Sequence, residues 1–291
     1  MTVITLSDTL SSHKRIWATL ITNKDYLPGV LTLNYSLKKV NSAYPLVALY
    51  TNQLDIDALN ILHKNNILTL MIDPIKPNSD DIDLVDKRFI DTWSKLYFFK
   101  LTQFDRIVQL DSDMLIRKNL DELMTLDLNG NKFASTHACV CNPNKFDHYP
   151  KTWIRENCSF TDLSHPTHVA HANSGLSKCN SGILVINPSL DLFNQIQSKL
   201  NDTDAVNSYI FPDQDLLVDL FNNDWLALSH NYNCLKTFKN AHPNIWDLDH
   251  IKIIHYILSP KPWNVDRSYN DLTGTFHLWW DENDERISNI Q

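Results

Sequence analysis

The sequence contains few glycines and none of the common glycine-rich motifs. Only five of its 291 residues are glycine. The Gly-x-Gly-x-x-Gly turn of dinucleotide-binding proteins and the Gly-x-x-x-x-Gly-Lys-Ser/Thr loop of P-loop proteins are both absent. The Gly-x-Ser-x-Gly turn that carries the nucleophile of common α/β hydrolases is absent as well. Dinucleotide-binding, P-loop and serine hydrolase chemistry are therefore disfavoured.

The chain also lacks long apolar runs and an excess of positive charge. No apolar run approaches the roughly 20 residues of a membrane span, and the N-terminal residues MTVITLSDTLSSHKR lack the charged-then-apolar pattern of a secretory signal. A net charge of −8 argues against a general nucleic-acid binder. Because 43% of the residues are hydrophobic and 21% are charged, the composition is that of an ordinary globular protein. We expect a soluble, cytoplasmic protein.

Five cysteines form an odd set without the spacing of a disulfide framework, which suits a reducing compartment. Four residues of one stretch could be interpreted as zinc ligands: His137, Cys139, Cys141 and His148. Their spacing matches no structural zinc pattern. We therefore favour isolated thiols and ordinary histidines over a zinc site.

Strand and helix patterns alternate along the first 110 residues. The predicted strands, rich in β-branched and aromatic residues, lie at residues 15–22, 45–50, 68–72 and 106–110. The predicted helices lie at residues 29–40 and 55–65, with apolar residues at helical spacing, and at residues 89–101, which are rich in aromatic residues. Such alternation indicates an α/β fold with a mostly parallel sheet and right-handed crossovers.

The second half of the chain shows weaker order. Its predicted strands lie at residues 133–137, 182–187 and 251–255, and its predicted helices at residues 190–200 and 213–221. Residues from about 139 to 179 show no clear periodicity, so we expect an irregular surface excursion of the kind that often faces a substrate. With no repeat and no convincing linker, one domain over residues 1–291, with its core at about 15–265, is the simplest prediction.

The triplet Asp111-Ser112-Asp113 directly follows the predicted strand at 106–110. Two carboxylates at a strand end where the chain turns can both face one crevice, and such hard oxygen ligands suit Mg²⁺ or Mn²⁺ with a bound diphosphate. The pattern Asp-x-Asp occurs six times, so the triplet alone carries little weight. Only this copy follows a buried strand, and ligands gather at the carboxyl ends of strands in open α/β sheets. We weigh metal binding evenly against an ordinary acidic turn.

Two further groups of residues could complete such a site. His255 ends a predicted strand, and Lys261 follows it six residues later in a Lys-Pro-Trp sequence. The imidazole could complete the coordination of a metal and the lysine could neutralise phosphate, although a lone histidine there is more often structural. Thr22 and Asn23 lie at the turn after the first strand, where a nucleotide would sit, and Tyr26 could stack on its base.

Taken in order along the chain, six short motifs resemble glycosyltransferase family 8, the retaining family that contains glycogenin and galactinol synthase. Any one motif is common, whereas six in this order are specific. The resemblance covers about residues 16–263. The motifs are Thr19-Leu-Ile-Thr-Asn23 with Tyr26, Ser94-Lys-Leu96, Gln109-Leu-Asp-Ser-Asp113, Asn180-Ser-Gly182, Asp213-Gln214, and His255-Tyr256 with Lys261-Pro-Trp263.

The resemblance implies a retaining hexosyltransferase built on a single GT-A-type domain. It implies Mn²⁺ or Mg²⁺ as the metal ion and a UDP-sugar, UDP-glucose or UDP-galactose, as the donor. Residues 42–47 and 242–243 look more like the galactinol synthase branch, which suggests a polyol or cyclitol acceptor. The histidine-rich stretch at 165–171 could shape the acceptor site, and a homodimer is left open.

The resemblance also implies a role for each matched residue. The implied metal ligands are Asp111, Asp113 and His255. The residues that would act in catalysis are Lys95, Asp213 and Gln214, and no covalent nucleophile is assigned. Thr22, Asn23 and Tyr26 would bind uridine, and Lys261 would contact phosphate. The full implied donor site is Leu20, Thr22, Asn23, Tyr26, Lys95, Asp111, Ser112, Asp113, Asn180, Gly182, Asp213, Gln214, His255 and Lys261.

Three alternatives to an ordinary transferase are weighed. A self-glycosylating primer is disfavoured because residues 233–239, where glycogenin carries its modified tyrosine, contain none. A non-catalytic UDP-sugar-binding scaffold would have little need of the complete metal triad. A nucleotidyltransferase-like domain would need a glycine-rich basic loop near the N-terminus, and none is visible. One departure from glycogenin concerns the phosphate contact, because Leu258 stands where glycogenin has glycine.

Overall fold

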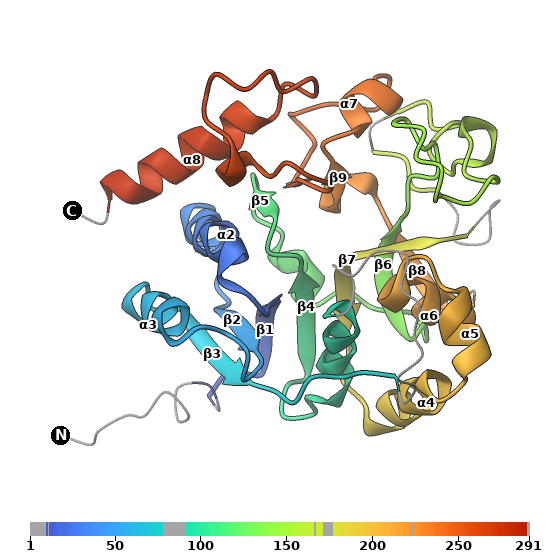
Figure 1. Ribbon diagram of the computed structural model, residues 1–291, viewed down its shortest axis with the longest axis horizontal. Helices are drawn as coiled ribbons and strands as arrows, with labels where there is room; N and C mark the ends of the chain where they lie inside the picture. The colour runs from blue at the N-terminus through green and yellow to red at the C-terminus, as the bar shows by residue number, and fades with distance from the viewer. Residues whose placement is uncertain are drawn as a thin grey trace.

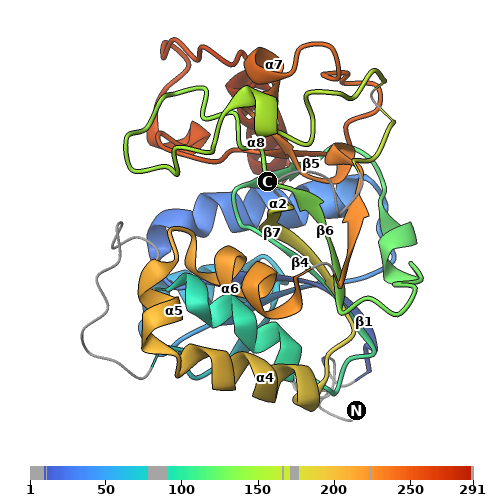
Figure 2. The same cartoon turned by 90° about the vertical axis from the view of Figure 1, so that its right-hand side faces the viewer.

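The computed structural model describes residue 10 and residues 12–77, 91–165, 167–170, 177–222 and 224–289. A seven-stranded sheet forms its centre, with helices on both faces (Figure 1). A second, less regular region lies beyond one edge of these layers, as the view turned by 90° shows (Figure 2). Among the described residues, no helix combines the length and the apolar character needed to cross a membrane.

The predicted mostly parallel α/β sheet is confirmed. Its strands, in spatial order, are β3 (Leu68–Met71), β2 (Leu46–Tyr50), β1 (Arg15–Ile21), β4 (Arg106–Leu110), β7 (Cys179–Ile186), β6 (Phe133–His137) and β8 (Trp225–Leu228). Only β7 runs antiparallel to its neighbours, and the other four neighbouring pairs are parallel. Such a sheet places the carboxyl ends of β1 and β4 side by side, where ligands gather in open α/β folds.

Alternating side chains of the central strands pack against helices on opposite faces. Ile16 and Ala18 of β1 join a core with the 3-10 helix η3 and the helices α4 and α6, whereas Trp17 joins a core with α2 and α3. Burial on both faces explains why these strands are continuous apolar runs. The helices are α2 (Leu27–Lys39), α3 (Ile56–Lys64), η3 (Thr92–Lys100), α4 (Leu190–Leu200), α5 (Thr203–Ser208) and α6 (Pro212–Phe221).

The second region consists of residues 138–165 and 230–288, and has its own apolar core. A three-stranded sheet joins it to the rest, in the order β5 (Met114–Ile116), β10 (Ile253–His255) and β9 (Cys234–Leu235). Its helices are α7 (Phe238–Ala241) and α8 (Phe276–Ser288), and α8 packs on α2. Residues 138–165 contain one short 3-10 helix, Arg155–Asn157, and are otherwise irregular, as expected for the predicted excursion.

Several elements differ from the sequence prediction. The helix predicted at 89–101 is a 3-10 helix from Thr92 to Lys100, and its predicted first residues, 89 and 90, lie outside the described part of the chain. The strand predicted at 251–255 is shortened to Ile253–His255. The short elements β5, β8, β9, α5 and α7 were not predicted, because too few residues repeat to show a period. The helix α8, in the Trp- and Asp-rich C-terminal segment, was not predicted either. Of the predicted excursion, residues 166 and 171–176 also lie outside the described part.

Candidate active site

A pocket of about 320 Å³ opens at the carboxyl ends of β1 and β4, between the central sheet and the second region. All fourteen residues of the predicted donor site line it. They come from the end of β1, η3, the turn after β4, β7, the first turn of α6 and the segment after β10. The fold therefore brings the six motifs together, while the role of each residue stays a prediction.

The Asp111-Ser112-Asp113 turn connects β4 of the large sheet to β5 of the small sheet. The Asp111 amide donates to the carbonyl oxygen of Gly182, and the Asp113 carbonyl accepts from the amide of Tyr256. Pairing of β10 with β5 sets His255 opposite Met114, one residue beyond the turn. A ladder between residues 140 positions apart therefore carries the histidine to the two carboxylates.

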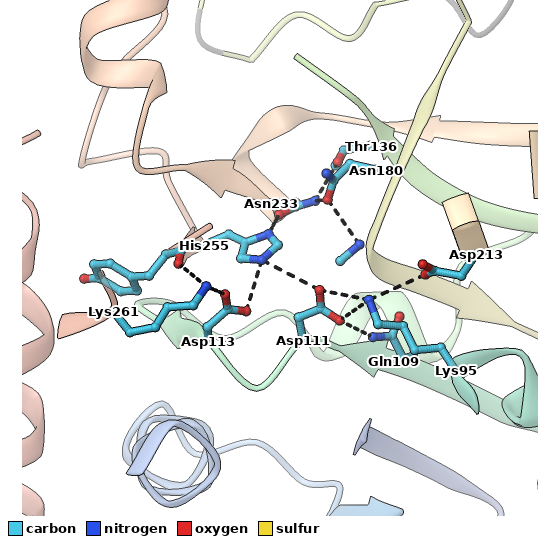
Figure 3. A network of polar contacts seen from close by, with 12 residues as sticks. Lys95, Gln109, Asp111, Asp113, Thr136, Asn180, Asp213, Asn233, His255 and Lys261 are labelled. Atoms are coloured by element: carbon cyan, nitrogen blue, oxygen red, sulfur yellow. Dashed lines mark hydrogen bonds and ion pairs between the residues drawn. The ribbon is translucent and has the colours of Figure 1, made fainter. Parts of the chain in front are cut away.

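Asp111, Asp113 and His255 form a compact group. One ligand atom from each residue lies within 4.8 Å of the others. The Nε2 atom of His255 lies 3.1 Å from Oδ1 of Asp113 and 3.8 Å from Oδ2 of Asp111 (Figure 3). Asp113 and His255 are buried, and Asp111 is half-buried at the pocket. Two carboxylates and one imidazole are a donor set that divalent metal ions accept.

A chain of hydrogen bonds fixes the orientation of the His255 ring. The Gly182 amide donates to Oδ1 of Asn180 at 3.1 Å, so this oxygen is an acceptor. Asn233 must then present its NH₂ group to Asn180, at 2.7 Å, and its Oδ1 to His255 Nδ1, at 2.8 Å. Nδ1 therefore donates to Asn233, and Nε2 is turned toward the two carboxylates.

An imidazole nitrogen that faces two carboxylates is stabilised by a proton or a metal ion between them. Metal-binding histidines have this arrangement, in which the second ring nitrogen donates to an oxygen that orients the ring. Asn233 also donates to Oγ1 of Thr136 at 3.0 Å, so the orienting amide is itself held from two strands (Figure 3). The side-chain geometry therefore fits a divalent ion.

Two lysines flank the acidic group on opposite sides. Lys95 lies 2.8 Å from Asp111 Oδ1 and 3.5 Å from Asp213 Oδ2, and Lys261 donates to Asp113 Oδ2 (Figure 3). Three carboxylates against two ammonium groups leave one negative charge in a largely buried site. A divalent ion and a diphosphate would add charges of opposite sign to it, which favours binding both together.

The charges of this network follow from burial and from its ion pairs. Burial alone would raise the pKa of Asp113, but Lys261 and His255 outweigh it and hold that pKa well below its ordinary value. Burial also opposes the charge of Lys95, yet Asp111 and Asp213 hold the pKa of Lys95 above its ordinary value. For Asp111, burial prevails over the attraction of Lys95 and raises the pKa.

The residues predicted for the nucleoside lie beside Lys261, whose ammonium group is 5.9 Å from the centroid of the Tyr26 ring. Tyr26 makes an edge-to-face contact with Trp263, with ring centroids 5.9 Å apart. Trp263 donates its indole N–H to the Asp25 carbonyl at 2.8 Å. Asn23 accepts from the Asp25 amide and so caps the short helix Lys24–Tyr26. The turn after β1 is thus tied to the Lys-Pro-Trp segment.

Sequence analysis did not predict that aromatic residues of the irregular stretch at about 139–179 form one wall of the pocket. Phe146, Tyr149 and Trp153 line it, and Trp153 stacks on Phe211 with ring centroids 4.9 Å apart. The aromatic spacing of this stretch was the available signal, but it follows no helix or strand period. His165 and His168, expected near the acceptor, do not line the pocket, and His171 lies outside the described residues. Asn233, which orients His255, carried no signal at all.

The chain is similar to known proteins in sequence and in fold. The sequence model of glycosyl transferase family 8 matches residues 18–267. Galactinol synthase 2 of Solanum lycopersicum is 26% identical over 289 residues, which cover 96% of this chain and 83% of the plant protein.

Two solved structures show the same fold. The galactosyltransferase LgtC, solved with donor and acceptor sugar analogues, superposes with a TM-score of 0.64 at 16% identity, covering 93% of this chain and 96% of that one. GlyE of Streptococcus pneumoniae superposes with a TM-score of 0.63 at 18% identity, covering 95% of this chain but only 63% of that one. The chain belongs to glycosyl transferase family 8 and is a hexosyltransferase with the GT-A fold.

Proposed function

We propose that the chain transfers a hexose from a UDP-sugar to a small acceptor, with retention of the anomeric configuration and with Mn²⁺ or Mg²⁺ in the pocket. The observation that carries the metal assignment is the orientation of His255, whose Nδ1 is held by Asn233 so that Nε2 faces Asp111 and Asp113. In this proposal residues 15–265 act as one transferase domain, in the cytoplasm, where nucleotide sugars are available.

Asp111, Asp113 and His255 would hold the ion against the two phosphates of UDP. When bound, the ion would stabilise the negative charge that develops on the leaving diphosphate. Lys261, whose ammonium group already lies in the acidic network, would neutralise further phosphate charge. Thr22, Asn23 and Tyr26 would bind uridine from the turn after β1.

Lys95, Asp213 and Gln214 would hold the donor sugar in a reactive orientation. Lys95 bridges Asp111 and Asp213, so it connects the metal ligands to the sugar side of the pocket. The Nε2 atom of Gln214 is buried and has no hydrogen-bond partner among the described residues. A buried donor without a partner at a pocket wall suits an acceptor oxygen of a bound sugar. Asn180 and Gly182 would line the same side.

The donor we favour is UDP-galactose, with UDP-glucose as the alternative, and the acceptor a cyclitol or another polyol. The matches to galactinol synthase 2 and to the galactosyltransferase LgtC support this choice. The aromatic wall of Phe146, Tyr149 and Trp153 offers flat apolar faces on which a sugar or cyclitol ring can pack.

Self-glycosylation is the second candidate function, and the position of Tyr232 argues against it. Its hydroxyl group donates to Glu122 at 2.8 Å, and the residue does not line the pocket. Residues 233–239, which run past the pocket at Thr237, contain no tyrosine. An increase in the mass of the chain after incubation with a UDP-sugar alone would instead support this candidate.

The decisive experiment is calorimetric titration of UDP with and without Mn²⁺. We expect the affinity of the wild type to fall at least about 100-fold without Mn²⁺, and Asp113→Asn to lose about 10- to 100-fold in the presence of the ion. The matched control is Asp57→Asn, which alters an exposed Asp-x-Asp copy at the start of α3. UDP binding that ignores both the ion and Asp113→Asn would overturn the metal triad, and a non-catalytic scaffold would become the better explanation.

A further inference from the structure

A second group of metal-binding side chains lies in the second region, apart from the acidic triad. Cys139, Cys141, Cys158 and His242 each offer one ligand atom, and the four atoms lie within 4.8 Å of one another. Cys139 and Cys141 follow β6, Cys158 ends the short helix Arg155–Asn157, and His242 ends α7. Three separate segments of the chain therefore converge on one point.

The distances within this cluster match those around a tetrahedral zinc ion. The Nε2 atom of His242 lies 3.3 Å from the sulfur of Cys139, 3.3 Å from that of Cys141 and 3.5 Å from that of Cys158. With Zn–S near 2.3 Å and Zn–N near 2.0–2.1 Å, tetrahedral coordination separates a ligand nitrogen from a ligand sulfur by about 3.6 Å. The three contacts thus correspond to three edges of a coordination tetrahedron.

We propose that Cys139, Cys141, Cys158 and His242 bind one structural Zn²⁺. Three thiolates and one imidazole are a donor set that structural zinc sites use, and four protein ligands leave no open position for a substrate. All three thiols are free, and an odd number of them around one nitrogen cannot be accounted for by a disulfide. Binding converts the thiols to thiolates and releases their protons.

Packing around the cluster orients its ligands before any ion binds. The rings of Phe160 and Phe238 lie against His242, with centroids 5.8 and 5.0 Å away. Arg155 donates to the carbonyl oxygen of Ala241 at 2.6 Å and so ties the segment of Cys158 to the end of α7. His242 is fully buried, and its Nδ1 has no hydrogen-bond partner among the described residues, so only Nε2 is directed at other ligand atoms.

The zinc interpretation that the sequence analysis weighed and disfavoured named a partly different set of residues. Cys139 and Cys141 belong to the cluster, but His137 and His148 do not. His137 contacts Ser159 through Nδ1, and His148 packs against Phe146. The cluster takes its other ligands 17 and 101 residues beyond Cys141, a spacing that corresponds to no local zinc motif and becomes visible only in three dimensions.

The position of the cluster indicates what a bound ion would stabilise. Cys139 itself lines the active-site pocket, and the chain from Cys139 through Cys158 carries the aromatic wall that includes Phe146 and Trp153. An ion at the cluster would fasten both ends of this stretch to α7. We therefore expect the ion to keep the acceptor side of the pocket in shape, while the acidic triad binds the donor independently.

The test is the zinc content of the reduced, full-length chain, measured by elemental mass spectrometry after dialysis against a mild chelator. We expect about one zinc per chain in the wild type and less than about 0.1 in Cys158→Ala. Cys234→Ala, which removes a buried thiol outside the cluster, is the matched control and should keep the zinc. Asp113→Asn should also keep it, which separates this site from the acidic triad.

A measurement on the wild type alone covers the case in which Cys158→Ala does not fold. Co²⁺ exchanged for the zinc should give the intense visible bands of a tetrahedral, thiolate-bound ion. Neither zinc nor such bands in the reduced wild type would overturn the proposal, as would zinc that persists in a folded Cys158→Ala.

A second readout rests on the proposed transferase function. In Cys158→Ala we expect transfer to the acceptor to fall at least about 10-fold, while Mn²⁺-dependent UDP binding changes less than about 3-fold. Because zinc content is measured without any substrate, failure of the transferase assignment would leave that first test unaffected.

Discussion

The central sheet and the second region are held together in different ways. In the sheet, β1 pairs along five residues with β2 and along four with β4, and its side chains are buried on both faces. In the second region the strands have two or three residues, and long segments have no regular structure. Backbone hydrogen bonds between strands thus stabilise the central sheet, whereas side-chain contacts stabilise the second region.

In the second region, hydrogen bonds between side chains and backbone groups take the place of strand pairing. The Tyr256 hydroxyl donates to the Thr275 carbonyl at 3.0 Å, and the Trp280 indole donates to the Pro262 carbonyl at 2.8 Å. The carboxylate of Asp271 accepts from the amides of Thr275 and Phe276. Such bonds satisfy irregular backbone that no strand pairs, so each depends on one specific residue.

The active-site pocket lies where these two parts meet. The sheet supplies Asp111 and Asn180, and the second region supplies His255 and Lys261. The rigid part therefore positions the carboxylates, and the part built from specific contacts delivers the histidine and a lysine. Changes that move one part against the other should affect the site most, and changes to their outer surface should affect it least.

The largest effect is expected from Gly182→Ala, which alters the contact between β7 of the sheet and His255 of the second region. A Cβ atom at Gly182 would lie 2.5 Å from Cε1 of His255 and 2.8 Å from Oδ1 of Asn180, and both side chains are locked by hydrogen bonds. Displacement of the histidine should lower kcat/KM for sugar transfer roughly 1,000-fold, because weaker metal binding and misplaced ligands combine. Steady-state kinetics and Mn²⁺-dependent UDP titration measure this loss.

Gly130→Ala is the control for that variant. Gly130 has a φ of +81° and no atom within 4 Å of an added Cβ, so alanine there should cost about 1 kcal/mol of stability through backbone strain and leave UDP binding unchanged. Normal UDP binding by Gly182→Ala would mean that His255 is not held against β7 as described.

A smaller effect should appear in the pH dependence of stability, through His230 of the second region. Burial lowers the pKa of His230 to about 4, although its bond to the Ile245 carbonyl opposes the shift. Between pH 6.5 and 4 the unfolded chain binds a proton that the folded protein does not, so stability falls as pH falls through this window. The loss should total about 3 kcal/mol, measured by urea unfolding at a series of pH values.

His230→Gln should remove this loss, because glutamine can donate to Ile245 but does not titrate. His277→Gln, which alters an exposed histidine of α8, is the matched control and should keep the wild-type pH dependence. Unfolding is compared at equal zinc content, since zinc binding also responds to pH. An unchanged pH dependence in His230→Gln would show that the second region buries this ring less than the structure indicates.

The smallest effect is expected at the outer surface, where α2 meets α8. Lys39 lies 3.0 Å from Glu282 and 2.6 Å from Glu285, and its side chain is 42% exposed. Lys39→Met keeps the aliphatic stem and removes the charge, so the free energy of unfolding should fall by less than about 1 kcal/mol, and by less still at high salt. Chemical unfolding at low and high salt measures the change.

Lys38→Met is the control at the neighbouring exposed position, for which no ion pair is found among the described residues. If Lys39→Met instead cost more than about 2 kcal/mol, surface charges would have to be counted among the contacts that hold the two parts together.

Prediction from sequence was strongest where a strand or helix repeats its pattern. The strands at 15–21, 46–50, 68–71 and 106–110 and the helix at 190–200 were predicted to within two residues at each end. The pattern failed for β5 and β9, which are too short to show alternation, and it did not show that the helix predicted at 89–101 is the 3-10 helix η3. The six motifs, taken in order along the chain, identified fourteen residues that all line one pocket. No sequence spacing could show that Asn233 orients His255.

By itself, the sequence determined the α/β class, the family and the residues available as metal and donor ligands, because these depend on local periodicity and on short motifs read in order. Only the tertiary structure decided which side chains meet. The β5–β10 ladder carries His255 to Asp113, and the packing of α7 on residues 138–158 carries His242 to three cysteines. Such contacts join positions 84 or more residues apart, where chain folding and not spacing sets the distance between ligand atoms.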